Sequence, residues 1–375
     1  MTPPEDLADW LRLMQTPGVG ALTARQLLSA FGPPSLIFQT SHAALTRVVS
    51  AAVASALLAD PDRETQDLIA RTLQWAAQPG QACITLDDPA YPQSLLDITD
   101  PPPLLYALGD TALLGAPRRL AMVGARPPPA QGERDAQAFA QAFSEAGVTI
   151  VSGFALGIDA AAHRGALSAT GEHAGSTIAV LGTGCDRVYP PRHKELAHLV
   201  AVRGLLLSEF ALGTAPAKGN FPRRNRLISG LSRGVLVVEA ATHSGSLITA
   251  RLAGEQGREV FAMPGSIHNP LAHGCHRLIR EGAKLVETAQ DVLEEFAWDA
   301  RPAAKTTTKD ASPATEAPLE CDILRALGYD IRSFDDLSAR TGWPADRLGA
   351  RLLELELQGQ VARLPGGRFQ RIARA

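Results

Sequence analysis

The sequence is poor in the residues that build disulfide frameworks and zinc ribbons. Its 375 residues include four cysteines, and no two of them form a C-x-x-C pair. The group His268, His273, Cys275 and His276 is compact in sequence but fits no standard zinc spacing. We therefore predict reduced, unlinked thiols and no metal site. The four cysteines are Cys83, Cys185, Cys275 and Cys321.

Long apolar runs are also absent. No run reaches the roughly 18 residues that a membrane-spanning helix needs. The opening segment, MTPPEDLADW, is acidic where a leader would be basic. Hydrophobic residues make up 45% and charged residues 20% of the chain, a composition typical of soluble globular proteins with a sizeable core. We expect a cytoplasmic protein of two or three domains, with no membrane partner.

Sequence signatures of nucleotide-hydrolysing enzymes are missing. GTGCDR (residues 182–187) has GxG but no third glycine, and no GxxxxGK[ST] loop occurs. The PGGxGTxxE motif of Rossmann-like enzymes that cleave nucleoside monophosphates is absent too. Asp159 and His163 lie four residues apart, which we interpret as a local pair in a first helical turn rather than an acid–base couple. No catalytic residue and no cofactor are predicted, and a nucleotide-processing hydrolase is kept as an alternative function.

One stretch of the chain lacks acidic residues altogether. No Asp or Glu occurs between Glu209 and Glu239, over the 29 residues 210–238. The same stretch gathers basic residues, although the net charge of the whole chain is only −3. Because no acid lies nearby in the sequence, we expect little ion pairing and a positive patch suited to a phosphate backbone. The basic residues, which we expect to lie close together, are Lys218, Arg223, Arg224, Arg226 and Arg233.

A turn of small residues lies near the end of this stretch. The short β-branched run at residues 235–238 predicts a buried strand. Ser244, Gly245 and Ser246 then open a helical segment at residues 247–256. The free backbone N–H groups of a helix start suit an anion, above all a phosphate. With Phe221 available to stack on a base, the combination is typical of a site for a nucleic-acid strand.

From about residue 119 to residue 296, strand-like runs alternate with Gly-bearing turns and helical segments. This alternation predicts a mainly parallel, doubly wound α/β sheet, whose ligands bind beyond the carboxyl ends of the strands. Four turns should line one rim of the sheet, at the carboxyl ends of its strands. They lie at Gly124, at Ser152 and Gly153, at residues 182–184 and at the Ser-Gly-Ser element. Predicted strands cover residues 83–86, 120–123, 148–151, 177–181, 205–208, 235–238, 260–263 and 284–286.

The chain divides into five predicted segments. Residues 1–60 form a small helical domain, in which TPGVGALTARQLL (residues 16–28) resembles a helix-hairpin-helix; we favour a structural role for it over DNA contact. Residues 61–118 lead into the central Rossmann-like domain at 119–297. Residues 298–318 lack large apolar side chains and predict a flexible linker. Residues 319–375 hold three helical patterns and a hairpin with a Gly-Gly turn, which predict a winged helix.

The predicted winged helix has an unfavourable charge pattern for DNA. Its last helical segment carries Asp346, Glu354 and Glu356 against Arg347 and Arg351. That mixture suits a phosphate backbone poorly. A protein-contact or regulatory role is at least as consistent, and a winged-helix binder of duplex DNA stays a second alternative.

Four long motifs resemble those of the DNA-processing protein A (DprA, or Smf) family. They are SGFALGIDAAAH at 152–163, TIAVLGTGCDRVYPPRH at 177–193, FPRRNRLISGLS at 221–232 and SGSLITARLAGEQGREVFAMPGS at 244–266. The resemblance implies an extended Rossmann-like fold with a sterile-alpha-motif-like helical domain in front and a winged helix behind. It implies binding of single-stranded DNA and loading of the RecA recombinase onto it in natural transformation. We expect duplex DNA as a weaker partner. It also implies a homodimer formed through the Rossmann-like domain.

The resemblance also implies a set of DNA contacts. Arg126 matches the family's arginine after the first strand, and Lys218 with Phe221 matches its K-x-x-F pair. Ala125 stands where the family usually has Ser, and His276 where Asn is common, so neither is carried over. The full predicted set is Gly124, Arg126, Ser152, Gly153, Lys218, Phe221, Arg223, Arg224, Asn225, Arg226, Ser244, Gly245, Ser246 and Thr249.

Overall fold

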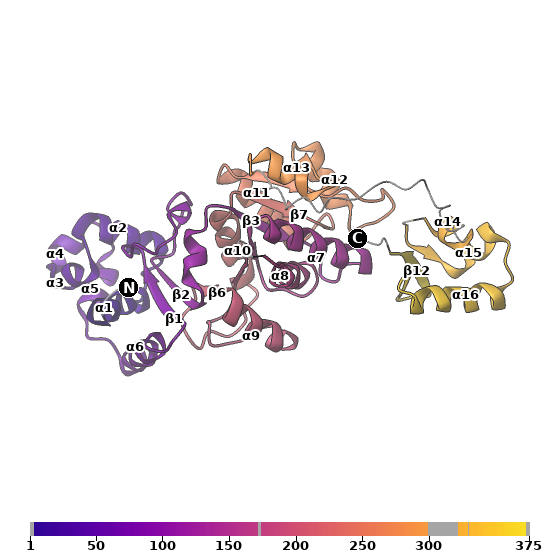
Figure 1. Cartoon of the computed structure of the whole chain (residues 1–375). Helices are drawn as coiled ribbons and strands as arrows, with labels where there is room; N and C mark the ends of the chain where they lie inside the picture. The colour runs from indigo at the N-terminus through magenta and orange to yellow at the C-terminus, as the bar shows by residue number, and fades with distance from the viewer. Residues whose placement is uncertain (1–3, 172–173, 299–321, 329, 373–375) are drawn as a thin grey trace.

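The structure of the chain, a computed structural model, describes residues 4–171, 174–298, 322–328 and 330–372. Figure 1 shows a helical region at the N-terminal end, a sheet flanked by helices in the middle and a small C-terminal group of helices and strands. Nearly all of the predicted linker, 298–318, lies outside the described residues. Among the described helices, each is too short or too polar to cross a membrane.

The N-terminal region consists of short helices around their own apolar cluster. Leu13, Leu27, Leu45 and Leu57 are fully buried in it. The turn between the first two helices contains Gly18, whose φ of 82° is a left-handed conformation that glycine adopts at little cost. The helices are α1 (Pro4–Gln15), α2 (Ala21–Phe31), α3 (Pro34–Gln39), α4 (His42–Leu45), α5 (Ala51–Leu58) and α6 (Arg63–Ala76).

A nine-stranded sheet forms the centre of the molecule, in the order β1-β2-β6-β5-β4-β3-β7-β8-β9. Strand β2 pairs antiparallel with both β1 and β6, whereas the pairs from β6 to β9 are all parallel. The predicted doubly wound sheet is therefore confirmed, with β2 as an addition that the proline-rich segment around residues 101–103 concealed. The strands are β1 (Gln81–Thr85), β2 (Leu104–Gly109), β3 (Arg119–Val123), β4 (Thr149–Ser152), β5 (Thr177–Val180), β6 (Leu205–Ser208), β7 (Gly234–Val237), β8 (Glu259–Ala262) and β9 (Lys284–Leu285).

Helices cover both faces of this sheet. The parallel strands are apolar on both sides, so each face needs a cover to remove it from water. One face packs against Phe143 of α7 and Ile158 of α8, and the other against Ile228 of α10 and Leu247 of α11. The helices are α7 (Ala130–Glu145), α8 (Ile158–Ser168), α9 (Lys194–Arg203), α10 (Asn220–Leu231), α11 (Gly245–Glu255), α12 (His273–Arg280) and α13 (Ala289–Glu295). Short 3₁₀ turns are η1 (Gln93–Leu95), η2 (Thr111–Gly115) and η3 (Pro191–His193).

The strand order reverses between β3 and β7. After β3 the chain adds β4, β5 and β6 on one side, and then returns to add β7, β8 and β9 on the other. Leu120 of β3 is in register with Ile150 of β4 on one side and with Gly234 of β7 on the other. In doubly wound sheets, ligands bind in the crevice at this switch point, beyond the carboxyl ends of the strands.

The C-terminal elements form the predicted winged helix. They are α14 (Asp322–Leu327), α15 (Phe334–Thr341), α16 (Ala345–Leu357) and the strands β10 (Arg332–Ser333), β11 (Val361–Leu364) and β12 (Arg368–Arg371). The hairpin β11–β12 turns through Gly366 and Gly367, both with positive φ. The two-residue strand β10, which the sequence did not reveal, adds to β12.

Candidate nucleic-acid interface

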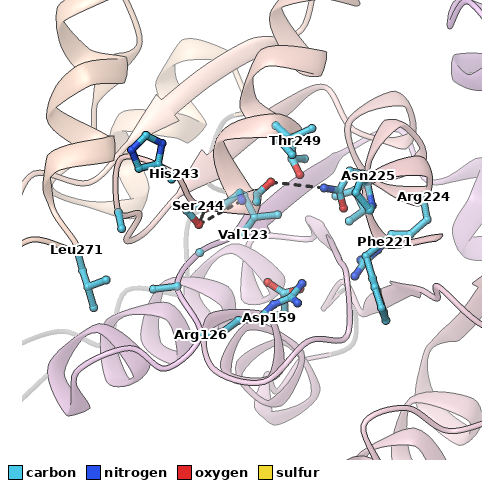
Figure 2. Close-up of a pocket in the computed structure, with 18 of the residues that line it drawn as sticks. Val123, Arg126, Asp159, Phe221, Arg224, Asn225, His243, Ser244, Thr249 and Leu271 are labelled. Atoms are coloured by element: carbon cyan, nitrogen blue, oxygen red, sulfur yellow. Dashed lines mark hydrogen bonds between the residues drawn. The ribbon is translucent and has the colours of Figure 1, made fainter. Parts of the chain in front are cut away.

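A cleft of about 490 Å³ lies at the switch point of the sheet. Figure 2 shows its walls: Arg126 follows β3, His243 and Ser244 precede α11, and Phe221, Arg224 and Asn225 project from α10. These segments are far apart in the sequence and meet here because parallel strands end at the same edge. Ten of the predicted contacts line the cleft: Gly124, Arg126, Lys218, Phe221, Arg224, Asn225, Ser244, Gly245, Ser246 and Thr249.

The start of α11 forms one wall of the cleft. Ser244 caps the helix, because its side chain accepts a hydrogen bond from the backbone N of Ser246. The hydroxyls of Ser244 and Ser246 lie 2.6 Å apart. Gly245 is exposed, and apart from its chain neighbours and the backbone of its own helix no atom lies within 4 Å of the Cβ that another residue would carry there. A phosphate can therefore approach the backbone and the positive end of the helix dipole.

Two exposed cations stand at the mouth of the cleft. Arg126 and Lys218 both line it, from the segments after β3 and before α10. Within the described part of the chain, neither side chain forms an ion pair or a hydrogen bond. Their charges are therefore available to a bound anion, because no described acidic side chain neutralises them.

Arg224 lies beneath these cations and is fully buried. Its side chain is 1% exposed, and Nη1 donates to the Val180 carbonyl oxygen at 3.2 Å. Its guanidinium lies directly on Gly153, where a Cβ would come within 1.7 Å of Nη1. Burial lowers the pKa of Arg224 to about 10, and the nearby Asp159 carboxylate opposes that shift. Arg224 thus keeps its positive charge at neutral pH on the floor of the cleft.

A smaller cavity of about 100 Å³ adjoins the cleft and shares Arg126, Phe221 and Arg224 with it. The ring of Phe221 lies against the backbone of Gly182, because a Cβ there would come within 2.8 Å of the ring. We call this cavity the side chamber. Tyr189, on its rim, has its ring centroid 5.7 Å from that of Phe221.

Comparison with protein families identifies the chain. Residues 82–297, more than half of its length, match the family described as DNA recombination-mediator protein A. The chain belongs to this family. Residues 307–367 also match the DprA winged helix domain.

Relatives of this DprA-family chain agree with that assignment. The Smf protein of Escherichia coli strain K12 is 43% identical over 311 residues, which cover 82% of each chain. The crystal structure of DNA processing protein A from Streptococcus pneumoniae matches with a TM-score of 0.66 and 36% identity, over 76% of this chain and 97% of that one. A structure of the Helicobacter pylori protein, described for its single-stranded DNA binding mode, matches with a TM-score of 0.52 and 32% identity, over 58% of this chain and 97% of that one.

The arginines of the DprA-like FPRRNR motif are more strongly paired than the sequence predicted. Glu209, whose side chain is 2% exposed, forms ion pairs with Arg223 at 3.1 Å and with Arg226, and Arg226 also pairs with Asp100 at 3.0 Å. The expectation of little ion pairing was wrong, because β6 ends beside α10 and brings Glu209 to both arginines. Arg233 was also misplaced: it directly precedes β7, at the amino end of the strands.

The four remaining predicted contacts do not line the cleft. Ser152 is fully buried and donates to the Met122 carbonyl oxygen at 2.6 Å, and Arg226 is buried in its ion pairs; both positions favour a structural role. Gly153 lines the side chamber rather than the cleft. Arg223 is half exposed outside the cleft, where its guanidinium stacks on the Phe210 ring.

Asp159 and His163 do not form the predicted local pair. His163 is fully buried, and its Nδ1 lies 2.6 Å from the Thr177 hydroxyl. Asp159 instead accepts a hydrogen bond from the Ala155 backbone N at 3.2 Å and lines the cleft. Burial lowers the pKa of His163 to about 3, so its ring stays neutral in the physiological range. The neutral imidazole packs inside the protein against the Phe154 ring and the Thr177 hydroxyl, and it lines neither the cleft nor the side chamber.

Several residues of the site were missed by the sequence reasoning. His243 and Asp159 line the cleft, and Tyr189 lines the side chamber. A signal existed for Tyr189, since it lies in the same turn region as GTGCDR, beyond a predicted strand. Glu209 also carried a signal, because it stands at the last position before the acid-free stretch and directly follows a predicted strand.

Proposed function

We propose that this DprA-family protein binds single-stranded DNA in the switch-point cleft and does not alter it chemically. The observation that carries the proposal is the meeting of three kinds of phosphate ligand at one place. These are the cations Arg126 and Lys218, which have no partner among the described residues, the buried guanidinium of Arg224 and the open backbone at Gly245. The Helicobacter pylori relative, described for its single-stranded DNA binding mode, supports the same ligand.

Each part of the cleft has a distinct task in this proposal. The start of α11 and Arg126 hold one phosphate from opposite walls, and Arg224 adds a fixed positive charge below it. Lys218, on an exposed loop, neutralises a neighbouring phosphate. Phe221 stacks on a base, which contributes about 1–3 kcal/mol per base with little sequence preference, because every base has a π-face.

The resemblance to the DprA family supports two finer proposals. We propose that two copies associate through their Rossmann-like domains, so that two clefts hold one strand along its length. We also propose that the held strand is protected and passed to the RecA recombinase in natural transformation. Duplex DNA is the weaker proposed partner, because the winged helix mixes acidic with basic side chains.

Charge reversal tests the central proposal. The variant Arg126→Glu/Lys218→Glu is expected to bind fluorescent oligo-dT at least about 100-fold more weakly, because hydrogen bonds to charged groups contribute roughly 1.5–3 kcal/mol each. Arg277→Glu is the matched control, since Arg277 is half exposed on α12 and pairs with Glu281 outside the cleft. Binding that survives the double reversal, or falls equally in the control, would reject the cleft as the DNA site.

A nucleotide panel separates binding from hydrolysis. The protein is incubated with nucleoside monophosphates and oligo-dT, and released bases are followed by chromatography. We expect intact nucleotides at every time point. Release of base above that from the Arg126→Glu/Lys218→Glu variant would replace the binding proposal with the hydrolase alternative.

A further inference from the structure

The last helix of the winged helix, α16, carries large apolar side chains on two faces. Leu348, Leu352 and Leu355 are buried in the core of the winged helix. On another face, Leu353 is 57% exposed and Leu357 is 81% exposed, more than any other large hydrophobic side chain in the described part of the chain. Figure 1 shows α16 along the lower edge of the C-terminal group. Packing of the core therefore explains one face of this helix and not the other.

Helical geometry aligns the two exposed leucines with a third apolar residue. At about 100° per residue, Ala350, Leu353 and Leu357 lie within about 60° of one another around the axis, and Ala350 is also exposed. We call these three residues the α16 stripe. Their spacing of three and then four residues is the spacing of an apolar seam between two helices. Single exposed apolar residues are common on protein surfaces, but an aligned set is typical of a contact face.

The α16 stripe is poorly suited to DNA. In helix-turn-helix proteins that read duplex DNA, the helix after the turn enters the major groove and contacts base edges with polar or basic side chains. Leucine side chains offer no hydrogen bonds to base edges or phosphates. The exposed carboxylate of Glu354, beside the stripe, would also repel a phosphate backbone. The surface therefore favours another protein surface over a nucleic acid.

The charges beside the stripe are complementary to themselves. Arg347 and Glu354 are both exposed and, seven residues apart, flank the stripe on the same side. In an antiparallel pair of α16 helices with Ala350 of one copy opposite Leu353 of the other, each Arg347 lies within about 3 Å, along the axis, of the level of Glu354 in the other copy. A parallel pair would place like charges side by side. The charge pattern therefore favours a second copy in the antiparallel direction.

Local contacts hold both of these charges near the stripe. Cζ of Arg347 lies 4.3 Å from the centroid of the Trp343 ring, and Glu354 forms an ion pair with Arg351. That ion pair is largely exposed to water, so it contributes little by itself. A carboxylate has room for more than one donor, so Glu354 can also accept a guanidinium from a second copy. Side chains that are already ordered lose less conformational entropy when they pair.

We propose that the α16 stripe packs antiparallel against the α16 stripe of a second copy of this chain. The winged helix then serves as a self-association module rather than a reader of duplex DNA. Two-fold symmetry makes both halves of the contact the same, with Leu353 and Leu357 of each copy inside and an Arg347–Glu354 pair toward each end. The contact is small, and copies held near each other reach a high effective concentration that favours it. It is separate from the proposed association through the Rossmann-like domains and does not depend on it.

The experiment cross-links the full-length chain through one introduced thiol. Cys321→Ser serves as the background, since the other three cysteines are buried. In the proposed pair the two copies of residue 350 lie about 4.5 Å apart along the axes of helices that pack 8–10 Å apart, within reach of a short bismaleimide. Ala350→Cys should therefore give a covalent dimer on a denaturing gel. Ala339→Cys, at an exposed alanine of α15, is the matched control. The control, and Leu353→Asp added to Ala350→Cys, should each give at least about fivefold less dimer.

A charge exchange tests the direction of the pair. In the Ala350→Cys protein, Arg347→Glu and Glu354→Arg should each lower the yield of dimer, because each places like charges at both ends of the contact. An equal mixture of these two proteins should restore the yield, since a mixed pair regains two pairs of opposite charge. Restoration also shows that both variants are folded.

Several results would overturn the inference. Equal cross-linking at positions 350 and 339, or a yield that Leu353→Asp leaves unchanged, would exclude the α16 stripe as the contact. Charge variants that have no effect, or whose mixture stays as low as each alone, would exclude the antiparallel pair. The outcome is distinct from that of the cleft: loss of oligo-dT binding in Arg126→Glu/Lys218→Glu tests the proposed function and leaves the α16 contact unaffected.

Discussion

A methyl group added at Gly153 tests how the floor of the cleft is built. In Gly153→Ala the new Cβ would lie 1.7 Å from Nη1 and 2.4 Å from Cζ of Arg224. Real Cβ atoms essentially never come closer than 3.0 Å to another heavy atom, so the guanidinium must leave its position. The φ of Gly153 is not in the positive range, so the backbone itself accepts alanine. Any destabilisation therefore reports on the contact with Arg224.

The magnitude follows from what Arg224 would lose. Overpacking of a buried site costs roughly 1–3 kcal/mol, and a hydrogen bond from a charged group, here Nη1 to Val180 O, contributes roughly 1.5–3 kcal/mol. A loss of about 3 kcal/mol in the free energy of unfolding is expected. For a domain of about 150–250 residues this lowers Tm by about 6–12 °C.

The assay is thermal and urea unfolding of four proteins that form a double-mutant cycle: the unmodified chain, Gly153→Ala, Arg224→Ala and the double variant. Because the double variant has no guanidinium to displace, it should be no less stable than Arg224→Ala. Gly254→Ala is the control for a glycine with open space around it. It lies inside α11 and should stabilise the protein by about 0.5–1 kcal/mol. A Gly153→Ala variant as stable as the unmodified protein, or additive effects in the cycle, would refute the reasoning.

Two further variants test the buried charges around the site. Glu209→Gln should lower the free energy of unfolding by about 3 kcal/mol, because it removes the charge of a buried partner of Arg226. Arg223→Ala should lower it by less than about 1 kcal/mol, since Arg223 is half exposed. Equal effects of the two variants in urea unfolding would contradict this. Burial, with the nearby Asp135, raises the pKa of Glu239 to about 8, so the folded state holds a proton that the unfolded state releases above about pH 4.5. Stability should therefore fall as pH rises from about 4.5 to 8, by at most about 1.4 kcal/mol per pH unit, and Glu239→Gln should remove this decline; parallel pH profiles of the two proteins would exclude it.

The parallel part of the fold was predictable because its signals are local. A short apolar run followed by a glycine-bearing turn and a helical segment marks most of the parallel strands, and the Ser-Gly-Ser element marks the start of α11 within three residues of sequence. The antiparallel strand β2 was not predictable in this way. Its segment directly follows three prolines in the sequence, and its pairing with β1 and β6 is determined only by tertiary packing.

The arginines of α10 show the limit of the sequence for the site. A helix turns by about 100° per residue, so Arg223, Arg224 and Arg226 face different surroundings although they are neighbours in the sequence. Only contacts distant in the sequence decide which one enters the cleft. The guanidinium of Arg224 packs against Gly153, whereas Arg223 and Arg226 form ion pairs with Glu209. The motif therefore predicted a basic helix at the right place, but not the division of its arginines between ligand and scaffold.

The salt dependence of oligo-dT binding tests the central claim, that exposed cations at the switch point hold the phosphates of an unpaired strand. Each phosphate contact to a single strand contributes about −0.7 to the slope of log K against log salt concentration. The unmodified protein should show a steep negative slope, and Arg126→Ala/Lys218→Ala should reduce its size by about 1.4. An unchanged slope in that double variant would contradict the account.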